Sequence, residues 1–191
     1  MRTPGRYAIR HAPGRSTFRH QHGEIVTHLR LGMVPDQAVK CAVLRVANQG
    51  ATARRLSMTA YAEWTLGVSR EQTQQHVVTT FEPEADAIFA RNPFDPQYAG
   101  WAAFHAISEP VISHTGDRRE FLGRNGTLSA PAALSGPLDL EGHLSGTTGA
   151  CIDPCSALRC DLELAPGDNI DIVVLLGAMP ESADGAFLDR A

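Results

Sequence analysis

The side chains best suited by type to bind a polar ligand are concentrated between Gly116 and Gly126. A guanidinium and an amide lie here on a glycine-containing segment, and such multi-donor groups suit the recognition of hydroxyl-rich ligands. Asp117 could accept from a hydroxyl or hold Arg118 in place. The alternative is structural, because an Asp–Arg pair beside a short helix can fix a loop, with Gly123 permitting special backbone angles. We favour the structural role; the candidate ligand contacts are Asp117, Arg118, Arg124 and Asn125, accompanied by Phe121.

Aromatic residues form the second candidate group, because aromatic faces stack on the apolar faces of sugar rings. Trp101 is the best of them, since it directly follows Tyr98-Ala99-Gly100 at the start of an expected strand and close to a loop. Trp64 lies on the apolar face of a strong strand pattern. Burial in a core or an interface is the more common fate of both tryptophans. Tyr98 and Phe94 complete the set of candidates.

A pair of carboxylates could act as the acid and base of glycoside cleavage. Glu82, Glu84 and Asp86 offer such groups in a Pro-containing turn, but nothing in the sequence distinguishes this turn from a solvated loop. No Ser/His/Asp order, P-loop or glycine-rich nucleotide fingerprint is present. We predict no catalytic residue in this chain.

Cysteine and histidine spacings do not predict a metal site. Cys151, Cys155 and Cys160, with nearby His143, are separated by three and four residues instead of the two typical of zinc knuckles. In a strand, Cys155 and Cys160 would also face opposite sides. We therefore predict no metal and no cofactor, and buried apolar positions for most cysteines.

Period-two alternation of apolar and polar residues predicts the elements that must position these groups. It is clearest over 55–64; the apolar segment 39–47 precedes it, and Asn48-Gln49-Gly50 between them is typical of a turn, which predicts a hairpin. The segment 158–164 alternates likewise, and after the turn Ala165-Pro166-Gly167-Asp168 the segment 170–176 is expected to return beside it. Weaker strand patterns cover 28–34, 75–81, 87–92 and 100–108.

Helical patterns are limited to a short turn over 117–122 and a C-terminal segment, 181–190, that Ser182 could cap. Between Thr127 and Thr148 the sequence is rich in Gly, Pro, Ser and Ala, which predicts a long ordered excursion over the surface. The fold class predicted is all-β: an antiparallel β-sandwich with one or two short helices.

Length and composition fit one folded domain. The chain has 191 residues, of which 43% are hydrophobic and 20% charged, far from a disordered composition. The net charge is −4 without any run of Lys or Arg, so we expect neither a nucleic-acid nor a membrane partner. The sequence shows neither a leader pattern nor an apolar stretch of spanning length, and we expect a soluble chain.

Four strings carry a family resemblance: the segment 116–126 (GDRREFLGRNG), 149–158 (GACIDPCSAL), 61–67 (YAEWTLG) and 90–94 (ARNPF). They resemble the β-sandwich domain of the glycoside phosphorylases acting on cellobiose and chitobiose, and most closely that of cyclic β-1,2-glucan synthases. The similarity covers nearly the whole chain. It implies a galactose mutarotase-like supersandwich that precedes an (α/α)6 barrel with the catalytic acid and phosphate site.

The resemblance also implies an organisation and a role. Residues 1–180 would be the sandwich, lacking its first strands, and 181–191 would begin a linker helix to the absent barrel. The chain would be a non-catalytic scaffold and glucan contact for that barrel, within a parent protein associated with a bacterial inner membrane. We also expect self-association into a homo-oligomer through surfaces left uncovered. The alternatives are a stand-alone mutarotase-type enzyme and a pure subunit-interaction domain.

Overall fold

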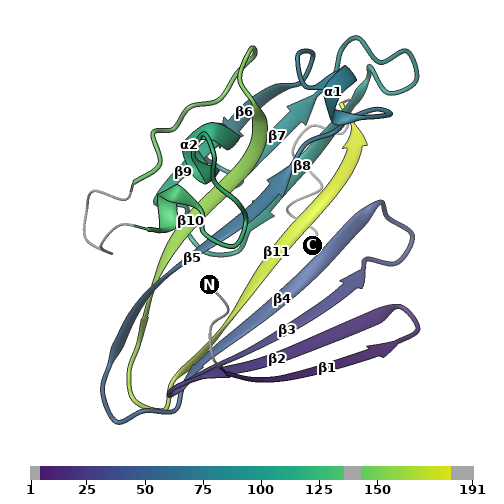
Figure 1. Ribbon diagram of the computed structural model, residues 1–191. Coiled ribbons are helices and arrows are strands. Elements are labelled where there is room, and N and C mark those ends of the chain that lie inside the picture. The colour runs from purple at the N-terminus through teal and green to yellow at the C-terminus, as the bar shows by residue number, and fades with distance from the viewer. Residues whose placement is uncertain (1–4, 136–142, 182–191) are drawn as a thin grey trace.

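Two antiparallel sheets make up the fold in the computed structural model, which describes residues 5–135 and 143–181 (Figure 1). The large sheet has the strand order β1-β2-β3-β4-β11-β8-β7-β6, and the small sheet has the order β5-β10-β9. The all-β sandwich predicted from period-two patterns is therefore confirmed. The large-sheet strands are β1 (Arg6–Ala12), β2 (Arg15–His22), β3 (Ile25–Met33), β4 (Val39–Asn48), β6 (Val78–Glu82), β7 (Ala87–Arg91), β8 (Trp101–Ile107) and β11 (Asn169–Pro180).

The small sheet and the helices lie on one side of the large sheet in Figure 1. The helices are short, as expected: α2 coincides with the helical turn predicted over 117–122, whereas α1 and a 3₁₀ turn carry no sequence pattern strong enough to predict them. These elements are β5 (Arg54–Glu63), β9 (Ser113–Asp117), β10 (Pro154–Leu164), α1 (Arg70–Thr73), α2 (Arg118–Leu122) and the 3₁₀ helix η1 (Ala132–Leu134).

The two predicted hairpins are wrong, although all four strands exist. β4 pairs with β3 and β11, and β5 pairs with β10, so the chain crosses from one sheet to the other at Asn48. The buried Asn48 amide Nδ2 donates to the carbonyls of Thr52 and Leu164, at 2.8 and 3.1 Å, which fixes this crossing. β10 and β11 likewise lie in different sheets. Their apolar faces meet across the core, so alternation predicts the strands without revealing their partners.

The main core lies between the sheets and is formed by the inward positions of both. Leu158, Cys160 and Leu162 of β10 pack against Val46 of β4 and Ile172 of β11. One polar pair lies in this layer: His105 Nδ1 and Ser156 Oγ, both buried, lie 2.8 Å apart. Burial lowers the pKa of His105 to about 4, so the imidazole is neutral at pH 7.

The strands β1 to β3 fan out beyond the two-layer part of the sandwich (Figure 1). Every residue of β1 is exposed, including Tyr7 at 63% and Ile9 at 56%. β1 pairs only with β2 among the described strands. The sequence pattern does not predict β1 and β2 as strands, because their alternating positions carry Arg and His and obscure the period-two alternation of apolar and polar residues.

Two sequence expectations reach beyond the described residues. The helix expected over 181–190 and part of the excursion over 127–148 cannot be compared with the structure, since 136–142 and 182–191 lie outside it. None of the helices within residues 5–135 and 143–181 is long and apolar enough to cross a membrane.

Candidate functional site

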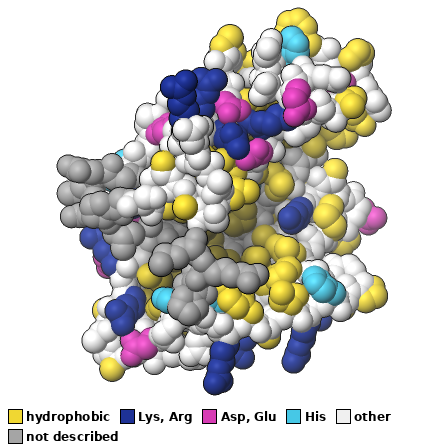
Figure 2. All heavy atoms as spheres, in the orientation of Figure 1, with side chains coloured by type: hydrophobic (Ala, Val, Ile, Leu, Met, Phe, Trp, Pro, Cys, Tyr) yellow, Lys and Arg dark blue, Asp and Glu magenta, His cyan; other side chains and the backbone are white. Residues whose placement is uncertain are grey.

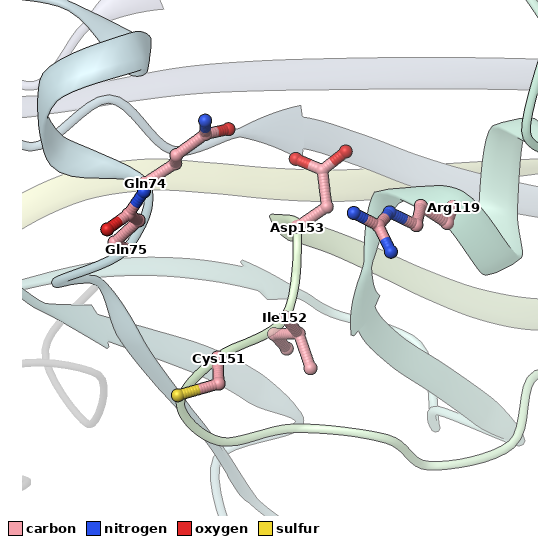
Figure 3. A pocket seen from close by; sticks show the side chains of 6 residues that line it. All are labelled: Gln74, Gln75, Arg119, Cys151, Ile152 and Asp153. Atoms are coloured by element: carbon pink, nitrogen blue, oxygen red, sulfur yellow. The ribbon is translucent and has the colours of Figure 1, made fainter.

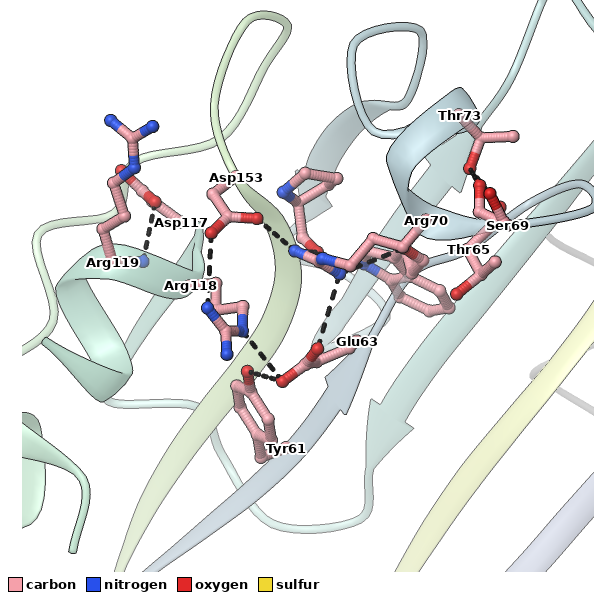
Figure 4. Close-up of polar contacts among 12 residues, drawn as sticks. Tyr61, Glu63, Thr65, Ser69, Arg70, Thr73, Asp117, Arg118, Arg119 and Asp153 are labelled. Carbon is pink, nitrogen blue, oxygen red and sulfur yellow. Dashed lines mark hydrogen bonds and ion pairs between the residues drawn. The ribbon is translucent and has the colours of Figure 1, made fainter. Parts of the chain in front are cut away.

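A polar cluster joins the end of β5 to α1, α2 and the segment before β10 (Figure 4). Glu63 Oε1 accepts hydrogen bonds from Arg118 Nε at 3.0 Å and from the Tyr61 hydroxyl at 2.9 Å. Arg70 forms an ion pair with Asp153 and reaches Glu63 Oε2 at 3.5 Å. Arg118 Nη1 also lies 3.5 Å from Asp153. Two guanidinium groups and two carboxylates therefore form a closed ring of alternating charge.

The neighbouring groups of this ring shift the pKa values of Glu63 and Tyr61. Burial raises the pKa of Glu63, but the hydrogen bonds from Arg118 and Tyr61 and the nearby positive charges outweigh it, so the pKa lies below its ordinary value. Burial and the hydrogen bond to Glu63 raise the pKa of Tyr61. A carboxylate held ionised in this way is a poor proton donor at neutral pH.

Arg70 also donates hydrogen bonds to the backbone where β5 and β10 meet. Its Nη1 donates to the carbonyls of Trp64 and Pro154, both at 3.3 Å, where β5 ends and β10 begins. Its side chain is 21% exposed. The Trp64 carbonyl thereby gains a donor, and the Pro154 carbonyl, which already accepts from the Trp64 N–H at 3.4 Å, gains a second one.

The segment 117–123 is shaped mainly by internal contacts. Asp117 caps α2, because its Oδ1 accepts from the backbone N–H of Arg119 at 2.9 Å. The ring of Phe121 stacks on that of Tyr61 with centroids 4.5 Å apart. Gly123, with φ at +87°, ends the helix in a conformation that favours glycine. Asp117 and Arg118 thus both have partners within the fold.

Arg124 and Asn125 differ from the rest of the segment. Both are exposed, and neither makes a hydrogen bond or ion pair with another described residue. They line neither of the two pockets described below. The structure separates the four candidates of this segment into two internally bonded residues and two free ones.

A polar pocket of about 460 Å³ opens beside the ring of charges (Figure 3). Asp153 forms one wall, and Arg119 extends toward it from α2. The side chains of Gln74, Gln75 and Arg119 have no hydrogen-bond partner among the described residues, so their amide and guanidinium donors are available. Cys151, exposed and with φ at +63°, and Ile152 complete the lining.

Sequence reasoning missed most of this pocket. Arg119, Cys151 and Asp153 lie within the strings that carry the resemblance, but only their neighbours were singled out as ligand contacts. The two glutamines follow the unpredicted helix α1. The charge ring juxtaposes positions 63, 118 and 153, and no single-sequence pattern indicates that proximity.

A second pocket, of about 410 Å³ and largely apolar, lies at the Trp101 end of β8. Trp101 is 38% exposed and meets Tyr98 edge to face, with ring centroids 6.2 Å apart. Trp64, by contrast, is 4% exposed within the core, and it cannot present its face to a sugar. The remaining lining residues are Ala38, Leu66, Gly67, Asn92, Asp95, Ala103 and Ala178.

The other groups considered for catalysis or metal binding are dispersed. Glu82 and Glu84 are exposed at the β6–β7 turn, while Asp86 accepts from the Val111 N–H at 3.0 Å. Cys155 and Cys160 are fully buried, and burial raises the pKa of both thiols, that of Cys160 to about 11. No cluster of three His, Cys, Asp or Glu side chains suited to a metal occurs within residues 5–135 and 143–181.

The comparison with known families gives a match over nearly the entire chain. The model described as "Glycosyl hydrolase 94, supersandwich domain" matches residues 1–188. Two curated proteins are similar in sequence. Cyclic beta-(1,2)-glucan synthase NdvB of Rhizobium meliloti (strain 1021) is 32% identical over 172 residues, and N,N'-diacetylchitobiose phosphorylase of Vibrio furnissii is 24% identical over 180 residues.

Each of these alignments covers 90% of this chain but only 6% and 21%, respectively, of the longer relatives. Among solved structures, a putative aldose 1-epimerase from Escherichia coli K12 superposes with a TM-score of 0.51 at 11% identity. That match covers 92% of this chain and 69% of the epimerase. At this identity the likeness concerns the fold alone.

Proposed function

Because the chain belongs to the glycosyl hydrolase 94 supersandwich family, we propose that it is the non-catalytic, glucan-contacting scaffold of a glycosyltransferase or glycoside phosphorylase. In this proposal the reacting groups belong to a separate barrel domain, and the sandwich contributes a surface for the same glucan. The relatives' names, a cyclic β-(1,2)-glucan synthase and a chitobiose phosphorylase, support β-linked oligosaccharides as the ligand class.

The observation that carries the proposal is the polar pocket beside the charge ring. Its free donors from Gln74, Gln75 and Arg119 line the same pocket as a carboxylate, Asp153, that two arginines bind. Sugar hydroxyls donate and accept hydrogen bonds, so a rigid acceptor opposite several free donors suits them. The volume of about 460 Å³ accommodates one or two sugar rings.

The non-catalytic role is supported by the state of the titratable groups near this pocket. Glu63 and Asp153 are both paired with arginines, and the lowered pKa of Glu63 makes this carboxylate a poor proton donor at neutral pH. Glycoside hydrolysis commonly uses two carboxylates flanking one bond, one of them protonated, and phosphorolysis likewise needs a protonated acid. The charge ring instead fixes the shape of the pocket wall.

The mutarotase alternative needs a general acid and base converging on one concave face. In the two-layer part, His105 faces inward but is 3% exposed beneath Ser156. On the uncovered inner positions of β1 and β2 there are histidines, His11, His20 and His22, but no carboxylate among the described residues of those strands. This arrangement favours the scaffold over the epimerase.

Titration calorimetry with linear β-1,2-linked gluco-oligosaccharides tests the proposal. We expect weak binding that the double change Gln74→Ala/Arg119→Ala reduces at least tenfold, while the matched change Gln49→Ala/Arg55→Ala leaves it unaltered. Trp101→Ala, measured in the same series, reports whether the aromatic pocket contributes. Binding that the pocket variants leave unchanged would refute the pocket assignment. Phosphorolysis or hydrolysis that survives joint replacement of Glu82, Glu84 and Asp86 would refute the non-catalytic role.

A further inference from the structure

The strands β1 to β4 carry a concentration of positive charge that the whole-chain charge conceals. Residues 5–48 contain seven of the chain's 17 Lys and Arg residues but only two of its 21 Asp and Glu residues, Glu24 and Asp36. The remainder of the chain is therefore strongly acidic. A search for consecutive Lys and Arg residues does not detect this concentration, because the basic residues are spaced along the strands.

Strand alternation places six arginines on one face of the sheet. Leu44 and Val46 of β4 point into the core, so Arg45 points to the opposite, outer face. The register pairs Arg45 with His28 of β3, and His28 with Arg19 of β2, which places these side chains on the same face. The full set of outward arginines is Arg6, Arg10, Arg15, Arg19, Arg30 and Arg45.

Four of these arginines form a zigzag on the β1–β2 ribbon. Arg6 is opposite Gln21, Arg10 is opposite Thr17, and Arg15 and Arg19 are opposite alanines of β1. No arginine directly faces another, which avoids the most unfavourable like-charge contacts. Each still has an arginine diagonally across the ribbon, at the roughly 7–8 Å typical of such positions. The result is a dense basic row on exposed strand positions.

The basic row has almost no internal counter-charge. Among the described residues, Asp171 of the neighbouring strand β11 is the carboxylate that pairs with these arginines: Arg45 makes two hydrogen bonds of 2.6 Å to it, and Arg30 lies 3.8 Å away. The arginines of β1 and β2 have no ion pair with any described residue. Figure 2 shows dark-blue side chains projecting from the lower edge of the molecule, where Figure 1 places these strands.

The residues between the arginines indicate which anion this face fits. Bases and sugar rings are bound with aromatic side chains as stacking partners, and the outer positions of β1 and β2 carry none. These positions hold Ala8, Ala12, Thr17 and Gln21 between the arginines. Neither the polar pocket nor the apolar pocket described above is lined by residues of this face. It is an open, extended array of guanidinium groups, which bind phosphates bidentately.

We infer that the outer face of β1–β4 docks onto a membrane surface rich in anionic phospholipid headgroups. The interaction is electrostatic, without insertion of apolar side chains. It would hold the sandwich with its basic face toward the headgroups and its pockets accessible. The inference is independent of the proposed glucan contact, which concerns other residues.

Co-sedimentation of the 191-residue chain with phosphatidylcholine vesicles, with and without phosphatidylglycerol, tests the inference. We expect binding only to vesicles with the anionic lipid, and loss of binding at high salt. A basic residue near an anionic bilayer contributes about a fivefold change in partition coefficient. Arg10→Gln/Arg19→Gln should therefore weaken binding about 25-fold. The matched exposed pair Arg55→Gln/Arg124→Gln, which lies outside this face, should change it by less than about threefold.

Circular dichroism of each variant establishes that it is folded, and Arg10→Lys/Arg19→Lys, which keeps the charge, should retain most of the binding. Equal binding to neutral and anionic vesicles would overturn the inference. So would equal losses in the test and control pairs. Binding to a soluble polyanion such as heparin or an oligonucleotide, without binding to anionic vesicles, would assign the face to a polymer instead.

Discussion

Arg118 Nε donates to Glu63 Oε1 over 3.0 Å and thereby ties helix α2 to the end of β5, 55 residues earlier in the chain. Asp153, on the segment before β10, is bound by the same guanidinium and by Arg70. Three separate parts of the chain meet at this ring, and one wall of the polar pocket depends on it. Its integrity should therefore govern stability and pocket shape together.

Arg70→Ala should lower the free energy of unfolding by about 2–3 kcal/mol. The substitution leaves Asp153 without its main ion pair and the Trp64 carbonyl without its side-chain donor, while the Pro154 carbonyl keeps the Trp64 N–H. Denaturant titration followed by circular dichroism measures the change. Arg70→Lys should recover only part of it, because an ammonium cannot bond all these acceptors in one plane. A loss below about 0.5 kcal/mol would show that the ring is a solvated surface feature.

Arg124→Ala, in contrast to Arg70→Ala, should have little effect on the stability of the chain. Its side chain is exposed and unpaired among the described residues, so the unfolding midpoint should shift only slightly, within about 0.5 kcal/mol. In a protein that also contains the proposed barrel, the same change should weaken activity or domain docking. Asn125→Ala should behave alike. Unfolding of the 191-residue chain by either change would assign these residues a structural role.

The stability of the chain should decrease as the pH falls from 7 to 5 because of His105. Burial lowers its pKa in the folded state to about 4, from an ordinary 6.5, so between these values the unfolded chain binds a proton that the folded chain does not. The contribution of neutral His105 to stability is fully present above pH 6.5 and is lost as the pH falls toward 4. The contribution lost by pH 5 is about 2 kcal/mol.

His105→Gln can still bond Ser156 but does not titrate, so the stability of this variant should fall less steeply over the same interval. The remaining slope should come from His114, whose pKa is also lowered by burial. Glu63 does not interfere, since its lowered pKa places its own loss of stability below about pH 4.5. Parallel slopes of unfolding free energy against pH in the two proteins would contradict a buried neutral imidazole.

Thiol reactivity should distinguish the four cysteines, all of which are free in the structure. Cys151 is exposed at the rim of the polar pocket and should react rapidly with a thiol reagent. Cys155 and Cys160 are buried, with raised pKa values, and should react only after unfolding. Half-buried Cys41 should be intermediate. Mass spectrometry after short labelling measures the order, and Cys151→Ser should remove the fast phase.

The strands whose alternation reflects burial could be predicted from the sequence. Leu56, Met58 and Ala60 alternate because one side of β5 packs against the core. The same logic fails for β1, where Tyr7 and Ile9 alternate with Arg6 and Arg10 but neither face is buried. Pairing could not be predicted either, because a turn such as Asn48-Gln49-Gly50 is compatible with a hairpin and with a crossing between sheets.

The candidate site residues could likewise be predicted only in part from the sequence. Residues in the recognised strings could be proposed as a group, but Arg118 and Arg124 have different surroundings, and only the fold distinguishes them. The basic face had a sequence signal: arginines at 6, 10, 15 and 19, with few acidic residues nearby. It escapes a search for consecutive charges because a strand sends alternate residues to opposite faces.

The uncovered inner face of β1 leads to the last prediction, that the chain self-associates. Tyr7 and Ile9 are more than half exposed on one face of an edge strand. Edge-to-edge pairing is opposed by Arg6 and Arg10, whose like charges would approach one another. Association through the apolar face keeps the arginines outward, and it should strengthen as salt screens their repulsion.

Multi-angle light scattering between about 1 and 100 µM should show a mass that rises with concentration. Ile9→Glu should hold the chain monomeric, since a carboxylate would have to be desolvated in the contact. Val68→Glu is the matched control, because Val68 is 91% exposed on a loop remote in sequence from β1; its mass should follow the unmodified chain. A constant monomer mass of the unmodified chain at high salt would contradict self-association and would show that Tyr7 and Ile9 remain exposed to solvent.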